Sequence, residues 1–380
     1  MMRVLHIHDH AFFQGGIEQI LFDTARGLSD QGCPQVLLHS GDFTDPEFTQ
    51  PFQSTGNQIS IIDSFKPDAA LIHKVADPQR VAAVAQSVPT AYMVHDHDLV
   101  CPRRHKYFPL SLSVCNKAAG ISCYLHLCCI QRAADGSVLP IRLKGTAQVK
   151  RQLKAVQTVR RFIVGSRYMK NELESNGISG ARIEIIHPIP AALKNPVAHP
   201  PSEVRNVLFV GQVVRGKGLD LMLKALSCLN GEWQATIVGD GNHLDACKAL
   251  AKRLGISLRV NFTGWIQHHE LDLYYRSARL LVVPSRWPEP FGMVGIEAMA
   301  RGRPVVAFNT GGISDWLDHN TTGLLLPPAD IPAMTSAIQR LLDDPLLAGE
   351  MGRAGVRHAQ RTFSHQAYLD QIKQQMEQLK

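Results

Sequence analysis

Short apolar runs alternate with longer amphipathic segments through the first half of the chain. Four apolar runs are typical of buried β-strands, at residues 3–8, 34–40, 68–73 and 90–95. Residues 15–32 and 78–88 instead repeat apolar positions every three to four residues, which predicts helices. Strands separated by helices indicate βαβ units, so we expect a parallel sheet with helices on both faces.

The same alternation restarts in the second half. The expected strands, one of them with the turn that follows it, lie at residues 207–212, 233–241, 259–265, 280–285 and 303–309. Helical spacing recurs between them, at residues 218–229 and 243–255. The fold class is therefore α/β, with two doubly wound, Rossmann-like domains. Paired domains of this kind bind ligands in a central cleft beyond the carboxyl ends of their strands.

A proline-rich break separates the two patterns. Five prolines lie between Pro188 and Pro201, in a stretch with no apolar period. This stretch reads as a linker. The expected division is a domain at 1–187, a linker at 188–201, a second domain at 202–362 and a terminal helix at 363–380. The terminal helix has an apolar stripe, which we expect to pack back on the first domain.

Composition fits a globular enzyme of two domains. The chain has 380 residues, 45% hydrophobic and 19% charged, and domains usually hold about 100–200 residues. It contains no apolar run of the ~18 residues that a membrane helix needs. The first residues carry histidines and an aspartate where a signal peptide needs an apolar core. We therefore expect a cytoplasmic protein.

The net charge of +7 favours anionic partners. Six basic residues and no acidic residue lie in the segment Lys144–Arg161. One interpretation is a solvated helix face. The other is peripheral contact with an acidic membrane, at its inner face, or with an anionic acceptor. No nucleic-acid-binding motif accompanies the charge, so nucleic acid is not an expected partner.

Two glycine-containing loops follow predicted strands and precede predicted helices. Gly15 and Gly16 form the first, and the second carries Arg215 and Lys217 within "GQVVRGKG". Glycines let a ligand approach the backbone, and a helix N-terminus favours a phosphate. Cations inside the second loop fit a phosphate better than a plain turn. The alternative for both is an ordinary connection between strand and helix.

A third loop, "VGDGN", contains Gly239 and Gly241. The third glycine of the dinucleotide fingerprint is replaced by Leu244, so we exclude a nicotinamide cofactor. The strand at residues 90–95 ends in His95, followed by Asp96 and Asp98. Such a carboxylate pair could hold a divalent cation on a diphosphate. A lone histidine is more often structural than catalytic.

The stretch "PEPFGMVGIEAMARG" holds two carboxylates, Glu289 before a Gly-rich turn and Glu297 on the helix after it. Carboxylates are bidentate acceptors suited to sugar hydroxyls, and the helix start suits a phosphate. Glu289 would hold a sugar and Glu297 a ribose. The alternative is two solvent-exposed glutamates, but the flanking residues are too apolar for a solvated face.

These residues resemble the E-x7-E signature of retaining GT-B glycosyltransferases of family 4. The segments "GGIEQ", "VHD", "GQVVRGKG", "VGDG", "NFTGW" and "HNTTGLLLPPAD" follow the order of that family. The resemblance covers nearly the whole chain and is more specific in the second half. It implies a GT-B fold and a hexosyltransferase-like enzyme of polysaccharide or cell-envelope synthesis.

The resemblance also implies roles. The catalytic group would be His95, Glu289 and Lys217; the donor would be held by Gly15, Gly16, Arg215, Lys217, Gly239, Gly241, Glu289, Phe291, Gly292 and Glu297. In this reading His95 hydrogen-bonds the donor sugar and Lys217 neutralises the diphosphate. The family usually has arginine where this chain has Gln212, and Arg215 is the candidate substitute.

The implied reaction moves a sugar from a UDP- or GDP-linked donor to a glycan, lipid-linked or small-molecule acceptor. The anomeric configuration is retained, no cofactor is required, and fixed cations with backbone amides meet the charge of the leaving group. Two alternatives remain open. One is a sugar-nucleotide epimerase of the same fold, and the other is a non-catalytic nucleotide-sugar binding protein.

Five cysteines cluster just after His95. Cys101, Cys115, Cys123 and Cys128 are candidate ligands for a structural zinc, with Cys129 as a fifth thiol. Their spacing is irregular and includes no C-x-x-C pair. The alternative is a set of buried free thiols, since free cysteine is among the most buried residue types.

Overall fold

The computed structural model describes residues 2–132, 141–143, 145–194, 196, 199–200, 202–267 and 270–379. The chain forms two compact units, which are described separately. The first contains residues 1–111, 115–189 and 365–380. The second contains residues 112–114 and 190–364. Part of the expected linker, residues 195, 197–198 and 201, lies outside the described residues.

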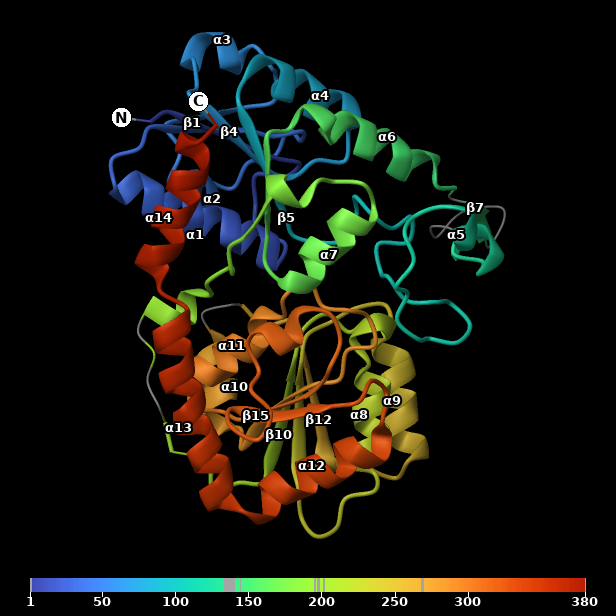
Figure 1. Cartoon of the computed structure of the whole chain (residues 1–380). Helices are drawn as coiled ribbons and strands as arrows, with labels where there is room; N and C mark the ends of the chain where they lie inside the picture. Colours follow the sequence, from blue (N-terminus) through green and yellow to red (C-terminus); the bar gives the residue numbers. More distant parts are fainter. Residues whose placement is uncertain are drawn as a thin grey trace. The chain divides into compact units, whose positions relative to one another are not determined.

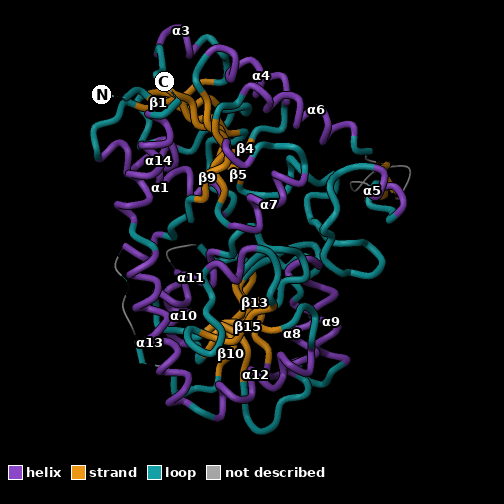
Figure 2. Tube along the Cα trace, viewed as in Figure 1, coloured by secondary structure: helices purple, strands orange, loops and turns teal. Residues whose placement is uncertain are grey.

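The first unit is built on a seven-stranded parallel sheet (Figures 1 and 2). Its strands in spatial order are β3 (Ser54–Gly56), β2 (Gln35–Leu38), β1 (Val4–His8), β4 (Ala69–Lys74), β5 (Thr90–Val94), β8 (Arg161–Val164) and β9 (Ile183–Ile185). The four expected strands form its centre. The strands β3, β8 and β9 were not predicted, and they complete its two edges.

Helices cover this sheet, and their starts follow local sequence rules. They are α1 (Gly16–Asp30), α2 (Pro46–Thr49), α3 (Ile61–Phe65), α4 (Pro78–Ser87), α6 (Ala147–Ala155), α7 (Arg167–Ser175) and α14 (His365–Glu377). The side chain of Asp77 caps α4 and that of Ser166 caps α7, each accepting a bond from a backbone N–H of the first turn. Pro78 occupies the first position of α4, where no N–H is needed.

The terminal helix α14 belongs to the first unit and contacts α1, β4 and β5. Its apolar stripe, including Leu369 and Ile372, is buried. The hydroxyl groups of Thr24 on α1 and Tyr368 on α14 lie 2.7 Å apart. A Cβ atom at Gly27 would lie only 2.4 Å from a Leu369 methyl carbon, so glycine allows the two helices to approach closely.

A long segment after β5 carries the short helix α5 (Ile121–Leu125) and an antiparallel pair, β6 (Ile130–Arg132) and β7 (Ile141–Leu143). Figure 1 shows α5 away from the seven-stranded sheet. A buried ion pair, with Lys106 Nζ 2.7 Å from Glu172 Oε2, ties the segment to α7. The segment is therefore attached to the unit by charge as well as by apolar contacts.

The second unit has a six-stranded parallel sheet. Its strands in spatial order are β12 (Val260–Gly264), β11 (Gln234–Val238), β10 (Asn206–Val210), β13 (Leu280–Val283), β14 (Val305–Phe308) and β15 (Gly323–Leu326). The five expected strands are confirmed, and β15 was not predicted. Two doubly wound α/β domains are thus observed.

The helices of the second unit pack against this sheet (Figure 1). They are α8 (Leu219–Leu226), α9 (Leu244–Arg253), α10 (Leu271–Ser277), α11 (Met293–Ala300), α12 (Ile331–Asp343) and α13 (Pro345–Thr362). The core is formed by the apolar faces of α8 and α12 against the strands. Because the sheet is parallel, the loops that carry Lys217 and Glu289 leave the carboxyl ends of the adjacent strands β10 and β13.

Candidate functional site

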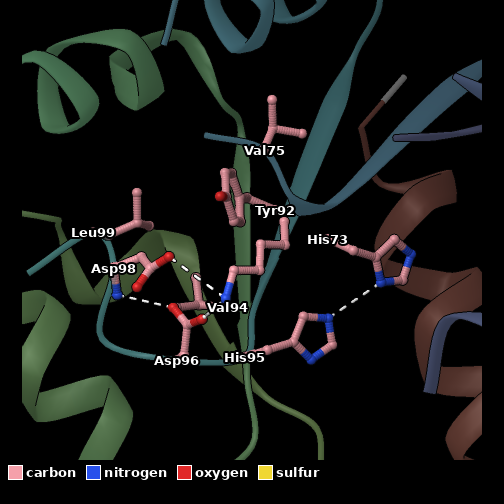
Figure 3. Close-up of a pocket in the computed structure, with 9 residues that line it drawn as sticks. His73, Val75, Tyr92, Val94, His95, Asp96, Asp98 and Leu99 are labelled. Carbon is pink, nitrogen blue, oxygen red and sulfur yellow. Dashed lines mark hydrogen bonds and ion pairs between the residues drawn. The ribbon is translucent and has the colours of Figure 1, made fainter. Parts of the chain in front are cut away.

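In the first unit, His95 directly follows β5 at the carboxyl end of the sheet. Figure 3 shows it beside His73, with Asp96 and Asp98 on the loop beyond. A small pocket at this point is lined by His73, Lys74, Val75, Tyr92, Val94, His95, Asp96, Asp98 and Leu99. Burial lowers the pKa of His95 to about 4, so its imidazole is neutral near pH 7.

The two aspartates after His95 are already paired with protein cations. Lys74 Nζ lies 2.6 Å from Asp96 Oδ2 and 3.6 Å from Asp98 Oδ2. Arg104 Nε lies 3.1 Å from Asp98 Oδ1. Burial alone lowers the pKa of Lys74, but the carboxylates outweigh it and raise that pKa above its ordinary value. The carboxylates thus act as the counter-ions of Lys74 and Arg104.

Gly15 and Gly16 form the exposed start of α1. Gly15 has an extended backbone, and a Cβ atom there would meet nothing closer than 3.8 Å. Neither the backbone nor the packing therefore requires glycine at this position. Glu18 in the first turn, whose carboxylate lies 2.9 Å from His8 Nε2, influences the pKa of His95. Because β1 and β5 belong to one parallel sheet, the start of α1 and His95 lie at the same, carboxyl end of that sheet.

The cysteine cluster does not have the geometry of a metal site. All five thiols are free and buried. Among the described residues, no group of three or more cysteine, histidine or carboxylate side chains is arranged to hold a metal ion. The zinc expectation therefore gains no support, and three of the buried thiols (Cys123, Cys128 and Cys129) pack against Phe108.

In the second unit, Lys217 and Glu289 are brought together from positions 72 residues apart. Lys217 Nζ donates to both carboxylate oxygens of Glu289, at 2.8 and 2.9 Å. The hydroxyl of Ser285 also donates to Glu289, and Lys217 Nζ lies 4.9 Å from the centre of the Trp287 ring. The Glu289 side chain is 5% exposed and that of Lys217 is 23% exposed. The more exposed cation is thus positioned by a buried carboxylate.

Arg286 holds the loop that carries Lys217 in place. Arg286 forms a bidentate ion pair with Asp220 on α8, and its backbone N–H donates to Gly216 O at 2.8 Å. Arg286 also donates to the carbonyl of Arg215 at 3.2 Å. The side chain of Arg215 is exposed, at the end of the loop where the resemblance expects a phosphate.

The turn before α11 rests on a buried tryptophan. Trp316 Nε1 donates to the carbonyl of Phe291 at 2.6 Å. Gly292, with φ 93°, is in the left-handed region that favours glycine and begins the helix. A Cβ atom at Gly295 would lie 2.0 Å from the Trp316 ring. The backbone amides at the start of α11 are therefore held by Trp316, which the sequence analysis did not identify.

Glu297 is buried on α11 and accepts a 2.7 Å hydrogen bond from the hydroxyl of Tyr275. Burial and the nearby carboxylate both raise the pKa of Tyr275, so the phenol remains a donor. Arg301 stacks on the Tyr275 ring and bonds to Asp272 at 2.8 Å. Glu297 does not contact Lys217 among the described interactions, and it is oriented by α10 instead.

Gly239 and Gly241 have a structural role that the sequence analysis did not consider. Both have positive φ, and Cβ atoms there would lie 1.9 Å from Gly211 O and 2.6 Å from Val213 O. Backbone bonds join the two loops, with Val213 N–H donating to Asp240 O at 2.8 Å. These glycines allow the loops after β10 and β11 to run in direct contact. Whether they also contact a donor stays a prediction.

Three of the six basic residues noted in the sequence lie together on one helix. Lys150, Arg151 and Lys154 are exposed on α6. Lys144 lies outside the described residues. The guanidinium groups of Arg160 and Arg161 donate to backbone carbonyls elsewhere in the unit. Among the described residues, no helix is both long enough and apolar enough to cross a membrane.

Comparison with known families matches part of the chain. Residues 194–358, which cover most of the second unit, match the family described as "Glycosyl transferases group 1". This segment is therefore similar to a glycosyltransferase group 1 domain. The matched segment contains Lys217, Glu289 and Glu297.

Two characterised relatives match at moderate identity. Alpha-D-kanosaminyltransferase of Streptomyces kanamyceticus is 32% identical over 169 residues, which is 44% of this chain and 44% of that protein. D-inositol 3-phosphate glycosyltransferase of Mycobacterium tuberculosis is 34% identical over 261 residues, which is 63% of this chain and 51% of that protein. The chain thus spans about half the length of each of these relatives.

The whole chain is similar in fold to a solved structure. HepE from Anabaena, determined in complex with UDP-glucose, matches with a TM-score of 0.75 at 17% identity, covering 100% of both chains. At this identity the likeness shows the fold alone. Together with the two parallel sheets, it identifies the fold as GT-B.

Proposed function

We propose that the protein is a retaining glycosyltransferase that transfers a sugar from a nucleotide-diphosphate sugar to a glycan, lipid-linked or small-molecule acceptor. The observation that carries the proposal is the ion pair between Lys217 and the buried carboxylate of Glu289. The pair lies beside the start of α11, in the segment that matches the glycosyltransferase group 1 family. The bond that breaks joins the donor sugar to the diphosphate. The cation suits the phosphate end of this bond, and the carboxylate suits the hydroxyls of the sugar.

Each group has a proposed role. Lys217 and Arg215 neutralise the diphosphate, and Glu289, once its ammonium partner moves toward phosphate, accepts bonds from sugar hydroxyls. The amides of Phe291 and Gly292 lie beside that sugar, and Glu297 accepts from the ribose. We further propose that His95 bonds the donor sugar and that the amides at Gly15 and Gly16 meet the leaving phosphate. The base is uracil or guanine, and UDP is favoured by the fold relative bound to UDP-glucose.

The first experiment screens UDP- and GDP-sugars for binding by calorimetry and for release of nucleoside diphosphate. We expect one donor class to bind and to be hydrolysed slowly without acceptor. Lys217→Ala should lower the release rate about 100-fold, as loss of a charge-stabilising group does. Lys224→Ala, which removes an exposed lysine on α8, is the matched control and should leave the rate unchanged.

The alternatives give distinct outcomes. A product with an altered sugar and an intact diphosphate would identify an epimerase. Binding without any turnover, with acceptors included, would identify a binding protein. Retention is tested by NMR of the transferred sugar, because an α-linked donor should give an α-linked product. An inverted product would contradict the retaining mechanism.

We also propose that the first unit, which would bind the acceptor, contacts the cytoplasmic face of an acidic membrane. Lys150, Arg151 and Lys154 lie on the exposed face of α6. Tyr124 OH on the neighbouring α5 lies 3.3 Å from Thr146 Oγ1 at the start of α6, so the two helices are adjacent. Large apolar side chains are exposed around α5: Leu110, Ile121, Tyr124, Leu125, Leu127 and Leu143. Apolar and basic side chains side by side are typical of peripheral membrane contact.

Vesicle co-sedimentation tests this contact. We expect binding to vesicles that contain phosphatidylglycerol and not to pure phosphatidylcholine. Replacing Lys150, Arg151 and Lys154 by glutamine should weaken binding about 100-fold, at ~1 kcal/mol for each basic residue. The same replacements at Lys248, Lys252 and Arg253, exposed on α9, are the control. An equal loss of vesicle binding in both triple variants would show that binding depends only on the net charge of the protein and not on a contact through α6.

A further inference from the structure

A row of polar side chains crosses the buried centre of the seven-stranded sheet. It consists of Gln35 on β2, His6 on β1, His73 on β4 and His95 after β5. These strands are neighbours in that order, so each strand contributes one residue. His6 and His73 are about 0–1% exposed, whereas His95 is partly exposed at the end of the row. The row therefore leads from the interior to the pocket in Figure 3.

The strand register explains why the row is continuous. Gln35 pairs with Val4, and His6 lies two residues beyond Val4. His6 in turn pairs with Leu71, and His73 lies two residues beyond Leu71. Side chains two residues apart share one face of a sheet. Each step thus moves one strand sideways and two residues toward the carboxyl end, on one face.

The last step lies at the ends of the two strands. Leu71 pairs with Ala91 and Ile72 with Tyr92, and His73 and His95 follow shortly after this last pair. The sequence pattern alone shows only histidines near strand ends, because the diagonal appears once the strand order is known.

Hydrogen bonds connect the row. Nε2 of His6 lies 2.8 Å from Oε1 of Gln35, and Nδ1 of His6 lies 3.2 Å from Nε2 of His73. Nδ1 of His73 lies 3.2 Å from Nε2 of His95. The rings of His73 and His95 are stacked with centres 5.4 Å apart. In every contact of the row, Nε2 of one histidine therefore faces either Oε1 of Gln35 or Nδ1 of the preceding histidine.

The amide of Gln35 sets the direction of the row. Its Nε2 donates to the backbone carbonyl of Ala25 on α1 at 2.7 Å. The reversed amide would place two acceptors against each other, so Oε1 must face His6. An amide oxygen only accepts, so Nε2 of His6 carries a proton. A neutral His6 then has an unprotonated Nδ1, which accepts from a protonated Nε2 of His73.

The same constraint passes to His95. Neutral His73 has an unprotonated Nδ1, so Nε2 of His95 must carry the proton. Burial lowers the pKa of His6 and of His95 to about 4 and that of His73 well below its ordinary value. All three rings are therefore neutral near pH 7, and the chain of donors has a single direction.

We propose that Gln35, acting through His6 and His73, is a positioning residue that fixes His95 as the Nε2–H tautomer. His95 then presents an unprotonated Nδ1, which accepts a hydrogen bond from a ligand hydroxyl. Among the described residues, this Nδ1 makes no hydrogen bond of its own. The ligand assignment rests on the proposed function, in which the hydroxyl belongs to the donor sugar. The tautomer does not depend on it.

The chemical consequence is selectivity for a donor group. An acceptor nitrogen bonds a sugar hydroxyl and repels a carboxylate or phosphate oxygen. His95 would therefore favour a neutral hydroxymethyl or hydroxyl over an acidic group at the same place. A neutral sugar is thus expected to bind better than the corresponding uronic acid.

The direct test is nitrogen NMR on protein labelled with ¹⁵N-histidine, with the His95 signals assigned from their loss in His95→Asn. We expect Nδ1 of His95 in the unprotonated region and Nε2 in the protonated region at pH 7.5. A protonated Nδ1 in the wild-type protein would overturn the proposal.

Variants at Gln35 test its cause. Gln35→Met keeps the length and removes the acceptor, so His95 should show a mixture of tautomers. Gln35→Glu in its protonated form, which burial favours, accepts from His6 and donates to the Ala25 carbonyl, so it should restore the wild-type pattern. Leu38→Ala, a buried change on the same strand whose side chain lies on the opposite face of the sheet, controls for general loosening and should leave the tautomer unchanged. A wild-type pattern in Gln35→Met would remove Gln35 from the mechanism.

Binding measurements separate the two proposals. With the donor found in the screen, Gln35→Met should weaken binding roughly fivefold, the effect of about one net hydrogen bond, and Gln35→Glu should recover it. The expected tautomer with no nucleotide-sugar binding would refute the proposed function and leave the role of Gln35 intact. Unchanged affinity in Gln35→Met with an altered tautomer would refute the contact between His95 and the ligand.

Discussion

At the scale of single residues, the candidate groups already have partners within the protein. The carboxylate of Glu289 holds Lys217, and Lys74 holds Asp96. Removing one partner of a buried charge pair costs more than forming the pair gains, because the remaining charge is desolvated. When a variant loses activity, a separate measurement of folding is therefore needed to distinguish a lost ligand contact from a destabilised protein.

Glu297 is predicted to serve both stability and binding. Glu297→Ala should lower the free energy of unfolding by ~1–3 kcal/mol, since it leaves the buried hydroxyl of Tyr275 without its main acceptor. Adding Tyr275→Phe should recover most of that loss in urea unfolding. Nucleoside-diphosphate affinity, measured by calorimetry, should stay low in both variants. Affinity that returns with stability would show that Glu297 does not bind the nucleotide.

Metal removal is predicted to have no effect on turnover. Asp96 and Asp98 are neutralised by Lys74 and Arg104, so they do not need a divalent cation for charge balance. Sugar transfer should therefore proceed at the same rate in EDTA and in manganese. Activity that is lost on chelation and restored by manganese or magnesium would instead assign a metal to the aspartate pair.

At the scale of elements, the loops at the strand ends are locked to one another. The loop after β14 bonds to the loop after β13, where Gly312 N–H donates to Glu289 O at 2.7 Å. A Cβ atom at Gly311 would lie 2.2 Å from the same carbonyl. Backbone contacts of this kind hold Glu289 without using its side chain. The position of the Glu289 backbone therefore does not depend on the bonds that its side chain makes to Lys217 and Ser285.

The contact of α11 with Trp316 is predicted to govern the same region. Gly295→Ala should lower the free energy of unfolding by ~1–3 kcal/mol, because its Cβ would lie 2.0 Å from a rigid, buried ring. Trp316→Phe makes room, so the double variant should be more stable than the two single losses predict. Urea unfolding of the four proteins measures the coupling. Strict additivity would mean that the ring moves aside freely.

The repeating strand–loop–helix pattern predicted the fold class and the central strands of both sheets. It did not predict β8, because the charge of the segment Lys144–Arg161 hid the apolar residues 162–164. The short strands β3 and β9 have too few residues to show alternation. Their pairing comes from neighbouring strands rather than from their own sequence.

The site was predictable only where chemistry and local spacing coincide. Glu289 and Lys217 could each be selected from their loops, but their contact joins residues 72 apart. The histidine row depends on strand order and register, and Trp316 lies beyond the next strand. The zinc prediction gains no support for a related reason, since cysteine spacing does not determine whether the thiols are arranged around a metal ion.

At the scale of the whole molecule, the two units differ in two residue types. Most histidines with a lowered pKa belong to the first unit, and the tryptophans belong to the second. The histidines whose pKa lies below the ordinary value are His6, His39, His73, His95 and His105 in the first unit and His199 in the second. All four tryptophans, Trp233, Trp265, Trp287 and Trp316, belong to the second unit. Fluorescence therefore reports on one unit only.

The last prediction is that the first unit loses stability in acid before the second. A histidine with a lowered pKa binds its proton more readily when unfolded, so its contribution is complete above pH 6.5 and is lost as pH falls toward 4. For buried His6 alone this amounts to roughly 3 kcal/mol. Asp220 in the second unit also has a lowered pKa, because its bond to Arg286 outweighs burial, but it loses stability only below its ordinary value of 3.8.

Urea unfolding at a series of pH values measures this difference. Between pH 6.5 and 4, the midpoint seen by far-ultraviolet circular dichroism should fall and split from the midpoint seen by tryptophan fluorescence. His6→Gln, which cannot be protonated, should flatten the pH dependence of the first transition, and His319→Gln on an exposed turn of the second unit is the control. Coincident midpoints across this range would mean that the two units unfold together or that the buried histidines titrate normally.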